Sequence, residues 1–413
     1  MNPSPNTPAE AELLLRGART HADPESIERL TSLLQHEVNW PLVIQSALEH
    51  GVLPLLYSNL RRHCRDAVPP AQLVELREHY ETLVRRTSLL TARLFTVLDS
   101  FGAHGIAAVP FKGPILAASV YGDPTLRVYG DLDILVHKEN IPRAAQLLVA
   151  HGYQQAGEGC DDLTHDPQEV AYLGPRYYVF LEPDQQVRID LQWRLAHRYF
   201  SFSLDNAAIW PRLIPVPVAG RVVRSFAPPD LLLILCAHGC KHRWEAVKWI
   251  CDVAELVRAH GAAIDWGGLE REATRFRAAR MLRLGLRLAA DLLGAELPKE
   301  MIPAVYADAK VRALALSVRR RFIARAWKPA DDMERLVFYV TAKDSWRDRG
   351  RFFARYLSQW LGRALTPTSR DRAFLPLPRS LFFVHYLVRP LRLTAQLGWS
   401  GLARRHQRAR SPK

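Results

Sequence analysis

Cysteine is scarce in this chain of 413 residues, and its five cysteines follow no regular spacing. They stand at Cys64, Cys160, Cys236, Cys240 and Cys251. A disulfide framework in a chain of this size would need more cysteines at recognisable intervals. We therefore expect a protein of a reducing compartment, the cytoplasm.

Long apolar runs are also missing. The first ten residues contain prolines and acids but no basic patch followed by an apolar run, so we expect no signal peptide. The most apolar stretch near the C-terminus, residues 374–399, is interrupted by Arg379, Arg389, Arg392 and three prolines. A membrane-spanning helix needs about 20 predominantly apolar residues in succession, so we expect none here.

Three glycine-based motifs are absent as well. The chain has no Gly-x4-Gly-Lys-Ser/Thr loop, no Gly-x-Gly-x-x-Gly turn after a strand and no Gly-x-Ser-x-Gly segment. These absences argue against a P-loop enzyme, a dinucleotide-binding enzyme and a serine hydrolase of the α/β type.

Positive charge is present in excess, but it is concentrated at one end. The chain has 56 Lys and Arg against 42 Asp and Glu, a net charge of +14. Residues 319–413 hold 22 Lys and Arg against 6 Asp and Glu, so they carry +16 and the first 318 residues carry −2. Aromatic residues are interleaved with the basic ones, namely Trp327, Trp346, Phe352, Phe353, Trp360, Phe382, Phe383, Tyr386 and Trp399.

This composition is typical of a segment that binds an anionic membrane surface or RNA. An amphipathic helix over residues 379–399 would bind lipid peripherally, at the inner face of the membrane. Arginine that serves only to keep the chain in solution explains the charge equally well, and the three interpretations stay open.

The order of helix-like and strand-like patterns predicts an α+β fold. We expect an N-terminal helical region over residues 1–104, a small mixed β-sheet flanked by helices over 105–225, a helical domain over 226–328 and a basic helical C-terminal region over 329–413. Strands are expected at 106–111, 131–136, 177–181 and 187–193, and helices between them at 114–121 and 142–151. Asp230 is expected to cap a helix over 231–242, and a further helix is expected over 244–260.

The most informative segment is the strand pattern Asp131-Leu132-Asp133-Ile134-Leu135-Val136. Side chains two apart in a strand face the same side, so Asp131 and Asp133 share a face while the apolar residues support it. Carboxylates this close repel unless a cation lies between them, and oxygen ligands of this kind suit Mg²⁺. A solvated aspartate pair at a strand edge is the alternative interpretation.

A third carboxylate follows on another strand. In the segment over residues 187–193, Ile189 and Leu191 alternate with Arg188, Asp190 and Gln192. If the two strands pair, Asp190 joins Asp131 and Asp133. Phosphoryl or nucleotidyl transfer is the chemistry that such a group of carboxylates favours.

These motifs resemble those of a known group of proteins. Lys112-Gly113, then Arg127, the Asp131-x-Asp133 strand, Ile189-Asp190-Leu191-Gln192-Trp193 and the stretch over residues 238–252 are similar to a bacterial group of largely uncharacterised nucleotidyltransferases of the polymerase β-type superfamily. The resemblance implies transfer of a nucleoside monophosphate from a nucleoside triphosphate, such as ATP, to a hydroxyl-bearing acceptor. It also implies two Mg²⁺ ions.

The resemblance assigns roles to six residues. Asp131 and Asp133 are expected to bind both Mg²⁺ ions, with Asp190 completing the site for the metal of the nucleophile. Lys112, the Gly113 turn and Arg127 are expected to bind and orient the triphosphate. Pro114 replaces the Ser or Gly that usually follows the glycine, and it suits the first position of a helix whose free N–H groups face an anion.

Histidines and cysteines gather downstream of the sheet, at Cys236, His238, Cys240, His242 and Cys251. On a helix with 3.6 residues per turn, Cys236 and Cys240 point away from His238 and His242. This arrangement argues against zinc. His238 is a candidate for the cleft, as a base or a phosphate contact, and a packing role is its alternative. Asp161, Asp162, His165 and Asp166 are expected to form an exposed acidic loop.

Two other functions are alternatives to this nucleotidyltransferase activity. The first is a nucleotide-binding scaffold without catalysis, although the presence of all three carboxylates argues against it. The second is an RNA-modifying transferase that uses the basic C-terminal region, which predicts salt-sensitive RNA binding. The acceptor itself cannot be read from the sequence.

Overall fold

The computed structural model describes residues 8–159, 177–184, 186–195, 206–323, 332–365 and 384. The chain divides into two units, Met1–Ser345 and Trp346–Lys413. The second unit contributes one described helix, α17 (Trp346–Leu365). The expected acidic loop and the expected helix over residues 379–399 lie outside the described residues. The four expected regions stay predictions, the first three falling within the first unit.

The N-terminal part of the first unit is helical. It contains α1 (Ala9–Gly17), α2 (Pro24–Leu34), α3 (Trp40–Glu49) and α4 (Leu53–His63). Side chains cap two of these helices: Asp23 accepts a hydrogen bond from the Ser26 N–H, and Asn39 accepts one from the Leu42 N–H. The chain turns from α3 into α4 at Gly51, whose φ of +66° lies in the left-handed region.

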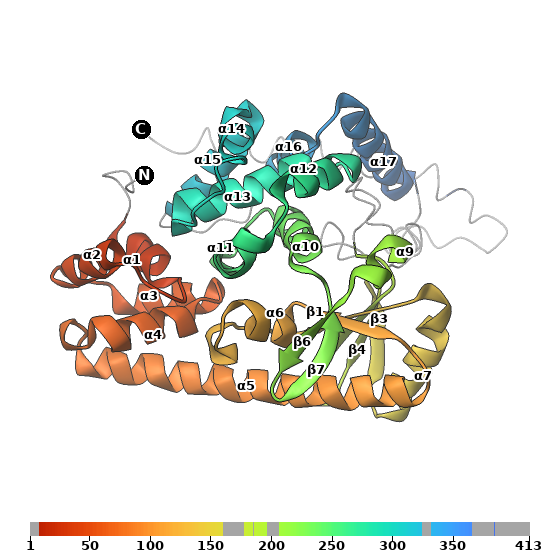
Figure 1. The fold of residues 1–413 in the computed structure, drawn as a ribbon, viewed down its shortest axis with the longest axis horizontal. Helices are drawn as coiled ribbons and strands as arrows, with labels where there is room; N and C mark the ends of the chain where they lie inside the picture. The colour runs from red at the N-terminus through yellow and green to blue at the C-terminus, as the bar shows by residue number, and fades with distance from the viewer. Residues whose placement is uncertain are drawn as a thin grey trace. The chain divides into compact units, whose positions relative to one another are not determined.

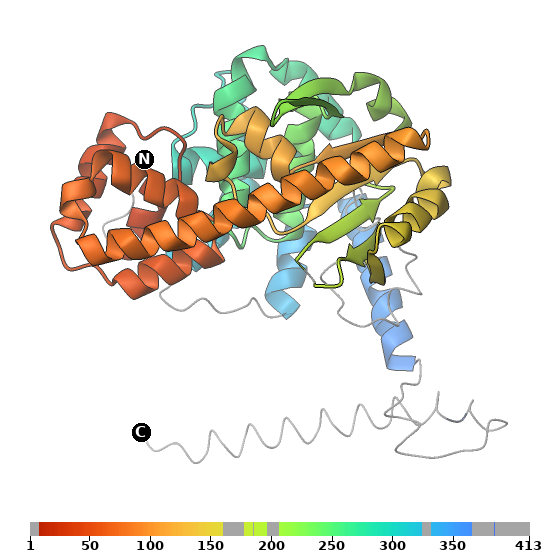
Figure 2. The same cartoon turned by 90° about the horizontal axis from the view of Figure 1, so that it is seen from below.

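The longest helix joins this helical part to the sheet. Helix α5 (Pro70–Ala103) has 34 residues, so it is about 50 Å long. It packs against α4 near its beginning and against α6, α7 and β1 farther along. Figures 1 and 2 show it running past the N-terminal helices and along the sheet.

The sheet is mixed and has five strands among the described residues, as the sequence predicted for the fold class. They are β1 (Ala108–Phe111), β2 (Leu132–Val136), β3 (Gln154–Gly159), β4 (Tyr177–Leu181) and β5 (Arg188–Gln192), in the order β1-β2-β5-β4-β3. Only the pair β2 and β5 is parallel. Two helices connect strands along the chain, α6 (Gly113–Val120) and α7 (Ile141–Ala150).

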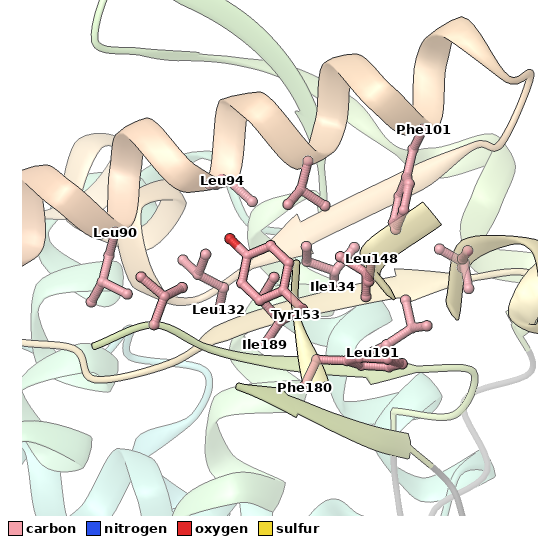
Figure 3. Packing of buried hydrophobic residues seen from close by; sticks show 14 of the residues in the cluster. Leu90, Leu94, Phe101, Leu132, Ile134, Leu148, Tyr153, Phe180, Ile189 and Leu191 are labelled. Carbon is pink, nitrogen blue, oxygen red and sulfur yellow. The ribbon is translucent and has the colours of Figure 1, made fainter. Parts of the chain in front are cut away.

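One face of this sheet forms the hydrophobic core. Leu132 and Ile134 of β2 and Ile189 and Leu191 of β5 are buried in the same cluster as residues of α5 and α7. Figure 3 shows them beneath Leu90, Leu94 and Phe101 of α5. Because successive side chains of a strand alternate, Asp133 and Asp190 lie on the opposite face. Asp131 precedes the strand, which begins at Leu132 and not at residue 131 as expected.

After the sheet come a hairpin and a helical region. The hairpin pairs β6 (Ile214–Val218) with β7 (Arg221–Ser225), and the sequence did not predict it. The short helix α9 (Asn206–Ile209) precedes this hairpin. The α-helices that follow it in the described ranges of the first unit are α10 (Pro228–Lys241), α11 (Val247–His260), α12 (Trp266–Arg275), α13 (Ala279–Leu293), α14 (Ile302–Ala307), α15 (Ala309–Ile323) and α16 (Asp332–Thr341).

Two helix starts differ from the expected ones. Helix α10 begins at Pro228, so Asp230 is not its cap but a buried residue of its first turn, paired with Arg212 at 2.7 Å. Helix α11 begins at Val247 and not at Trp244. Arg243 and Trp244 have positive φ angles of 50° and 55°, which a right-handed helix does not contain, so the chain turns here between α10 and α11. No helix in the described ranges is both long and apolar enough to span a membrane.

The core predicts a specific stability effect. Leu191 of β5 is completely buried in the core that the sheet forms with α5. Leu191→Ala should therefore lower the free energy of unfolding by about 2–5 kcal/mol. Urea denaturation monitored by circular dichroism measures this loss. The matched control is Leu316→Ala on α15, whose side chain is 46% exposed and whose loss should cost within about 0.5 kcal/mol. Equal effects would show that the sheet face is not packed as described.

Candidate active site

The turn between β1 and α6 is strained. Lys112 has a φ of 57° and Gly113 a φ of 39°, so two successive residues are left-handed. A non-glycine residue with such an angle costs energy and often marks a functional site. The turn aims the Lys112 ammonium at the sheet, where its Nζ donates to Asp133 Oδ2 at 2.9 Å. Pro114 lies in the first turn of α6, as the sequence predicted.

The carboxylates come together because β2 and β5 pair in parallel. Asp133 lies directly opposite Asp190 in this register, and Leu135 lies opposite Gln192. The Gln192 amide donates to Asp133 Oδ1. Arg188 donates from Nε and Nη2 to the two oxygens of Asp190, at 2.8 and 3.2 Å.

Asp131 and Asp133 lie close enough to Asp190 to affect its ionisation. Burial raises the pKa of Asp190 to about 6; the negative charges of Asp133 and Asp131 add to this shift, and Arg188 opposes it. The negative charges of two neighbouring carboxylates disfavour the ionised form of a third, and a nearby cation favours that form. As the side chains stand, no group of three His, Cys, Asp or Glu in the described residues is arranged to hold a metal ion. Lys112 and Arg188 supply the positive charge instead.

Arg127 is the centre of a buried network. Its Nε and Nη2 donate to the two carboxylate oxygens of Asp252 at 2.7 and 2.8 Å, and the Tyr121 hydroxyl donates to the same carboxylate at 2.7 Å. Arg127 Nη1 reaches the Gly113 carbonyl at 3.5 Å. Despite burial, Asp252 raises the pKa of Arg127. This geometry does not support the expected direct contact of Arg127 with a triphosphate, because its guanidinium is buried and already paired.

His238 lies beside the same cluster of charges. Its ring centroid is 4.6 Å from that of His242 and 5.7 Å from that of Trp249. Burial lowers the pKa of His238 well below its usual value, and the charges of Lys112 and of His242, Lys241 and Lys248 lower it further. The His238 ring thus lies within the electrostatic reach of Lys112.

The cysteines of this region lie elsewhere. Cys236 and Cys240 are completely buried, and the thiol of Cys236 packs against Gly285 of α13. His238 and His242 instead contact each other and Trp249. The two pairs thus point in different directions, as the helical spacing indicates.

The residues that form this geometry lie in a segment that matches a known protein family. Residues 36–294 match the family described as uncharacterised nucleotidyltransferase. The chain belongs to this family. It is an enzyme of nucleotidyl transfer, with a nucleoside triphosphate as substrate. No curated protein and no solved structure was found to match it.

Three residues near the carboxylates and Arg127 were given no role from the sequence, namely Arg188, Gln192 and Lys248. Gln192 and Arg188 share the polar face of β5 with Asp190, so the alternation that revealed Asp190 also indicated them. Lys248 precedes Asp252 by one helical turn on α11, a spacing that places both on one face. The partner of Asp252 is Arg127, which is 125 positions away in the sequence.

The Arg127–Asp252 pair predicts a non-additive effect on stability. Arg127→Met or Asp252→Leu alone should lower the free energy of unfolding by about 3–5 kcal/mol, because each leaves a buried charge without its partner. The double variant should lose much less than the sum of the two. Urea denaturation of all three provides the measurement.

The control for these variants is Arg312→Met, which removes an exposed guanidinium from α15 and should change stability by about 0.5 kcal/mol or less. Additive losses in the double variant would contradict a direct pair.

Proposed function

We propose that this enzyme is a Mg²⁺-dependent nucleotidyltransferase of the polymerase β type, which transfers a nucleoside monophosphate to an acceptor hydroxyl and releases pyrophosphate. The observation that carries the proposal is the register of β2 and β5, which sets Asp133 opposite Asp190 on the face away from the core. Asp131 adds a third carboxylate one residue before β2. Oxygen donors alone form this set, and hard dications prefer such donors.

Asp131, Asp133 and Asp190 would hold two Mg²⁺ ions, which supply charge stabilisation for the α-phosphate and lower the pKa of the acceptor hydroxyl. The ion pairs that Lys112 and Arg188 make with the carboxylates support this role, because they show that the site requires positive charge. Asp190 is the residue beside the nucleophile in this proposal.

The turn between β1 and α6 is the proposed triphosphate site. Lys112 would supply a point charge, and the N-terminus of α6, which begins at Gly113, would supply N–H groups for a phosphate. Arg127 holds the Gly113 carbonyl and thereby fixes the turn. His238 is proposed to line the cleft, as a base or as a phosphate contact.

Removing one carboxylate tests the proposal. Asp190→Asn should keep the fold and nucleotide binding but lose about 10² or more in turnover, because it removes a metal ligand used in the transition state. Pyrophosphate release from each of the four nucleoside triphosphates, with cell extract as the source of acceptor, measures turnover. The control is Asp66→Asn, an exposed residue between α4 and α5. Turnover equal to that of the unmodified enzyme would remove Asp190 from the site.

The basic C-terminal region supports a second proposal, peripheral binding to an anionic lipid surface. Among the described residues of the second unit, Trp346, Phe353 and Leu357 are exposed by 75%, 52% and 42%. Their spacing of seven and four places them on one stripe of α17. Exposed Arg347 and Arg351 accompany them. Interfacial helices combine apolar burial with basic residues in this way, at about 1 kcal/mol per charge.

Removal of the tail tests this second proposal. A chain that ends at Ser345, the last residue of the first unit, should stay folded and active on nucleotide, yet lose affinity for vesicles of anionic lipid in sedimentation assays. High salt should abolish the binding of the full chain as well, because the attraction is largely electrostatic. A full chain that ignores vesicles at low salt but binds RNA would favour the RNA-modifying alternative.

A further inference from the structure

Helix α11 packs against α6, and it carries Lys248 one helical turn before Asp252, the partner of Arg127. Arg127 in turn reaches the carbonyl of Gly113, next to Lys112. The backbone N–H of Lys248 donates to the His50 carbonyl at the end of α3, at 3.1 Å. Its side chain then passes over Gly51, where a Cβ would come within 2.7 Å of the Lys248 Cδ. The N-terminal helices therefore fix both the backbone and the stem of Lys248.

The ammonium of Lys248 has no hydrogen-bond or ion-pair acceptor in the part of the chain that the structure describes. Two carboxylates act on it electrostatically, Asp131 and Asp252, and two cations, Arg127 and Lys112. Asp252 is already paired with Arg127 in a bidentate contact. Lys248 is thus a partly buried cation whose nearest acidic network is occupied.

Several groups of the site act on the Lys248 ammonium. Burial lowers the pKa of Lys248, and the charges of Arg127 and Lys112 lower it further, whereas Asp131 and Asp252 oppose the shift. An anion that binds between Lys112 and Lys248 would give the Lys248 ammonium an acceptor.

We propose that Lys248 is a second phosphate-binding residue, which forms with Lys112 an anion site for the polyphosphate chain of the nucleoside triphosphate. This inference rests on the proposed function, because Lys112 gives its charge to a phosphate only when Asp133 has another cation. A lysine is suited to the task, since its compact charge binds phosphate without a fixed fork geometry. The helical domain thereby supplies part of the substrate site.

The first test uses inorganic tripolyphosphate as the probe, with Mg²⁺ in excess and calorimetry as the readout. Lys248→Gln should weaken tripolyphosphate binding about tenfold or more, the loss of one charge-assisted contact. The matched control is Lys299→Gln, which removes an exposed lysine between α13 and α14 and should leave binding unchanged.

Thermal unfolding separates this role from a structural one. Because the charge of Lys248 is unpaired, Lys248→Gln should unfold at the same temperature as the unmodified enzyme or at a higher one. A structural lysine would give a lower unfolding temperature. A lower temperature with undiminished tripolyphosphate affinity would overturn the proposal.

A second pair of variants moves Lys248 without replacing it. Gly51→Ala places a methyl group against the Lys248 side chain, whereas Gly105→Ala places one where no atom lies within 4 Å. The two glycines have φ angles of +66° and +68°, so both variants carry the same backbone strain. Tripolyphosphate binding should weaken in Gly51→Ala and not in Gly105→Ala. Equal binding by the two variants would overturn the proposal.

The outcome is distinguishable from failure of the proposed function. If Lys248→Gln binds tripolyphosphate normally while Asp190→Asn loses turnover, nucleotidyl transfer by the three carboxylates stands and the role of Lys248 is wrong. If the unmodified enzyme does not bind tripolyphosphate at all, the anion site is wrong for both lysines. Weakened binding together with retained stability supports the proposal.

Discussion

The buried pair between Arg127 and Asp252 is the interaction on which the site depends. It joins the loop before β2 to the middle of α11, so it fixes the sheet and the helical region at one point. Arg127 also holds the Gly113 carbonyl, and Asp252 lies one helical turn after Lys248. The pair therefore contributes to the placement of both lysines, and His50 and Gly51 hold Lys248 from the other end. Such a pair lends little net stability, but breaking it leaves a charge in the core.

A second constraint is the balance of charge on the polar face of the sheet. Parallel pairing of β2 and β5 forces two aspartates to be neighbours, and the strand alternation that buries Leu132 and Ile189 gives them no other face. Lys112 and Arg188 neutralise them from opposite sides. In the proposed mechanism, Mg²⁺ would take the place of these cations at the carboxylates. Its polar residues are costly to the fold, and the apolar core on the other face offsets that cost.

Local patterns predicted the parts of this structure that depend on local causes. Alternation revealed β2 and β5 with their aspartates, and Pro114 marked the start of α6. Strand β6 was missed because its sequence, Ile214-Pro215-Val216-Pro217-Val218, contains two prolines, which disfavour central strands but are tolerated in a two-stranded ribbon. Strand β3 has two glycines and no β-branched residue, so no propensity indicated it. The partner of Arg127 was unpredictable because it depends on how distant elements pack.

The family match contains the residues proposed for the reaction but not the basic C-terminal segment. The match begins at residue 36, just before α3, and ends at residue 294, just after α13. It therefore contains His50 and Gly51, which position Lys248, together with the sheet, α10 and α11. The segment with a net charge of +16 begins at residue 319 and lies entirely outside it. The matched part thus holds every residue proposed for the reaction. A partner found for the basic segment would locate the enzyme without identifying its acceptor. In the proposed mechanism the acceptor binds beside Asp190, on the face of the sheet away from the core.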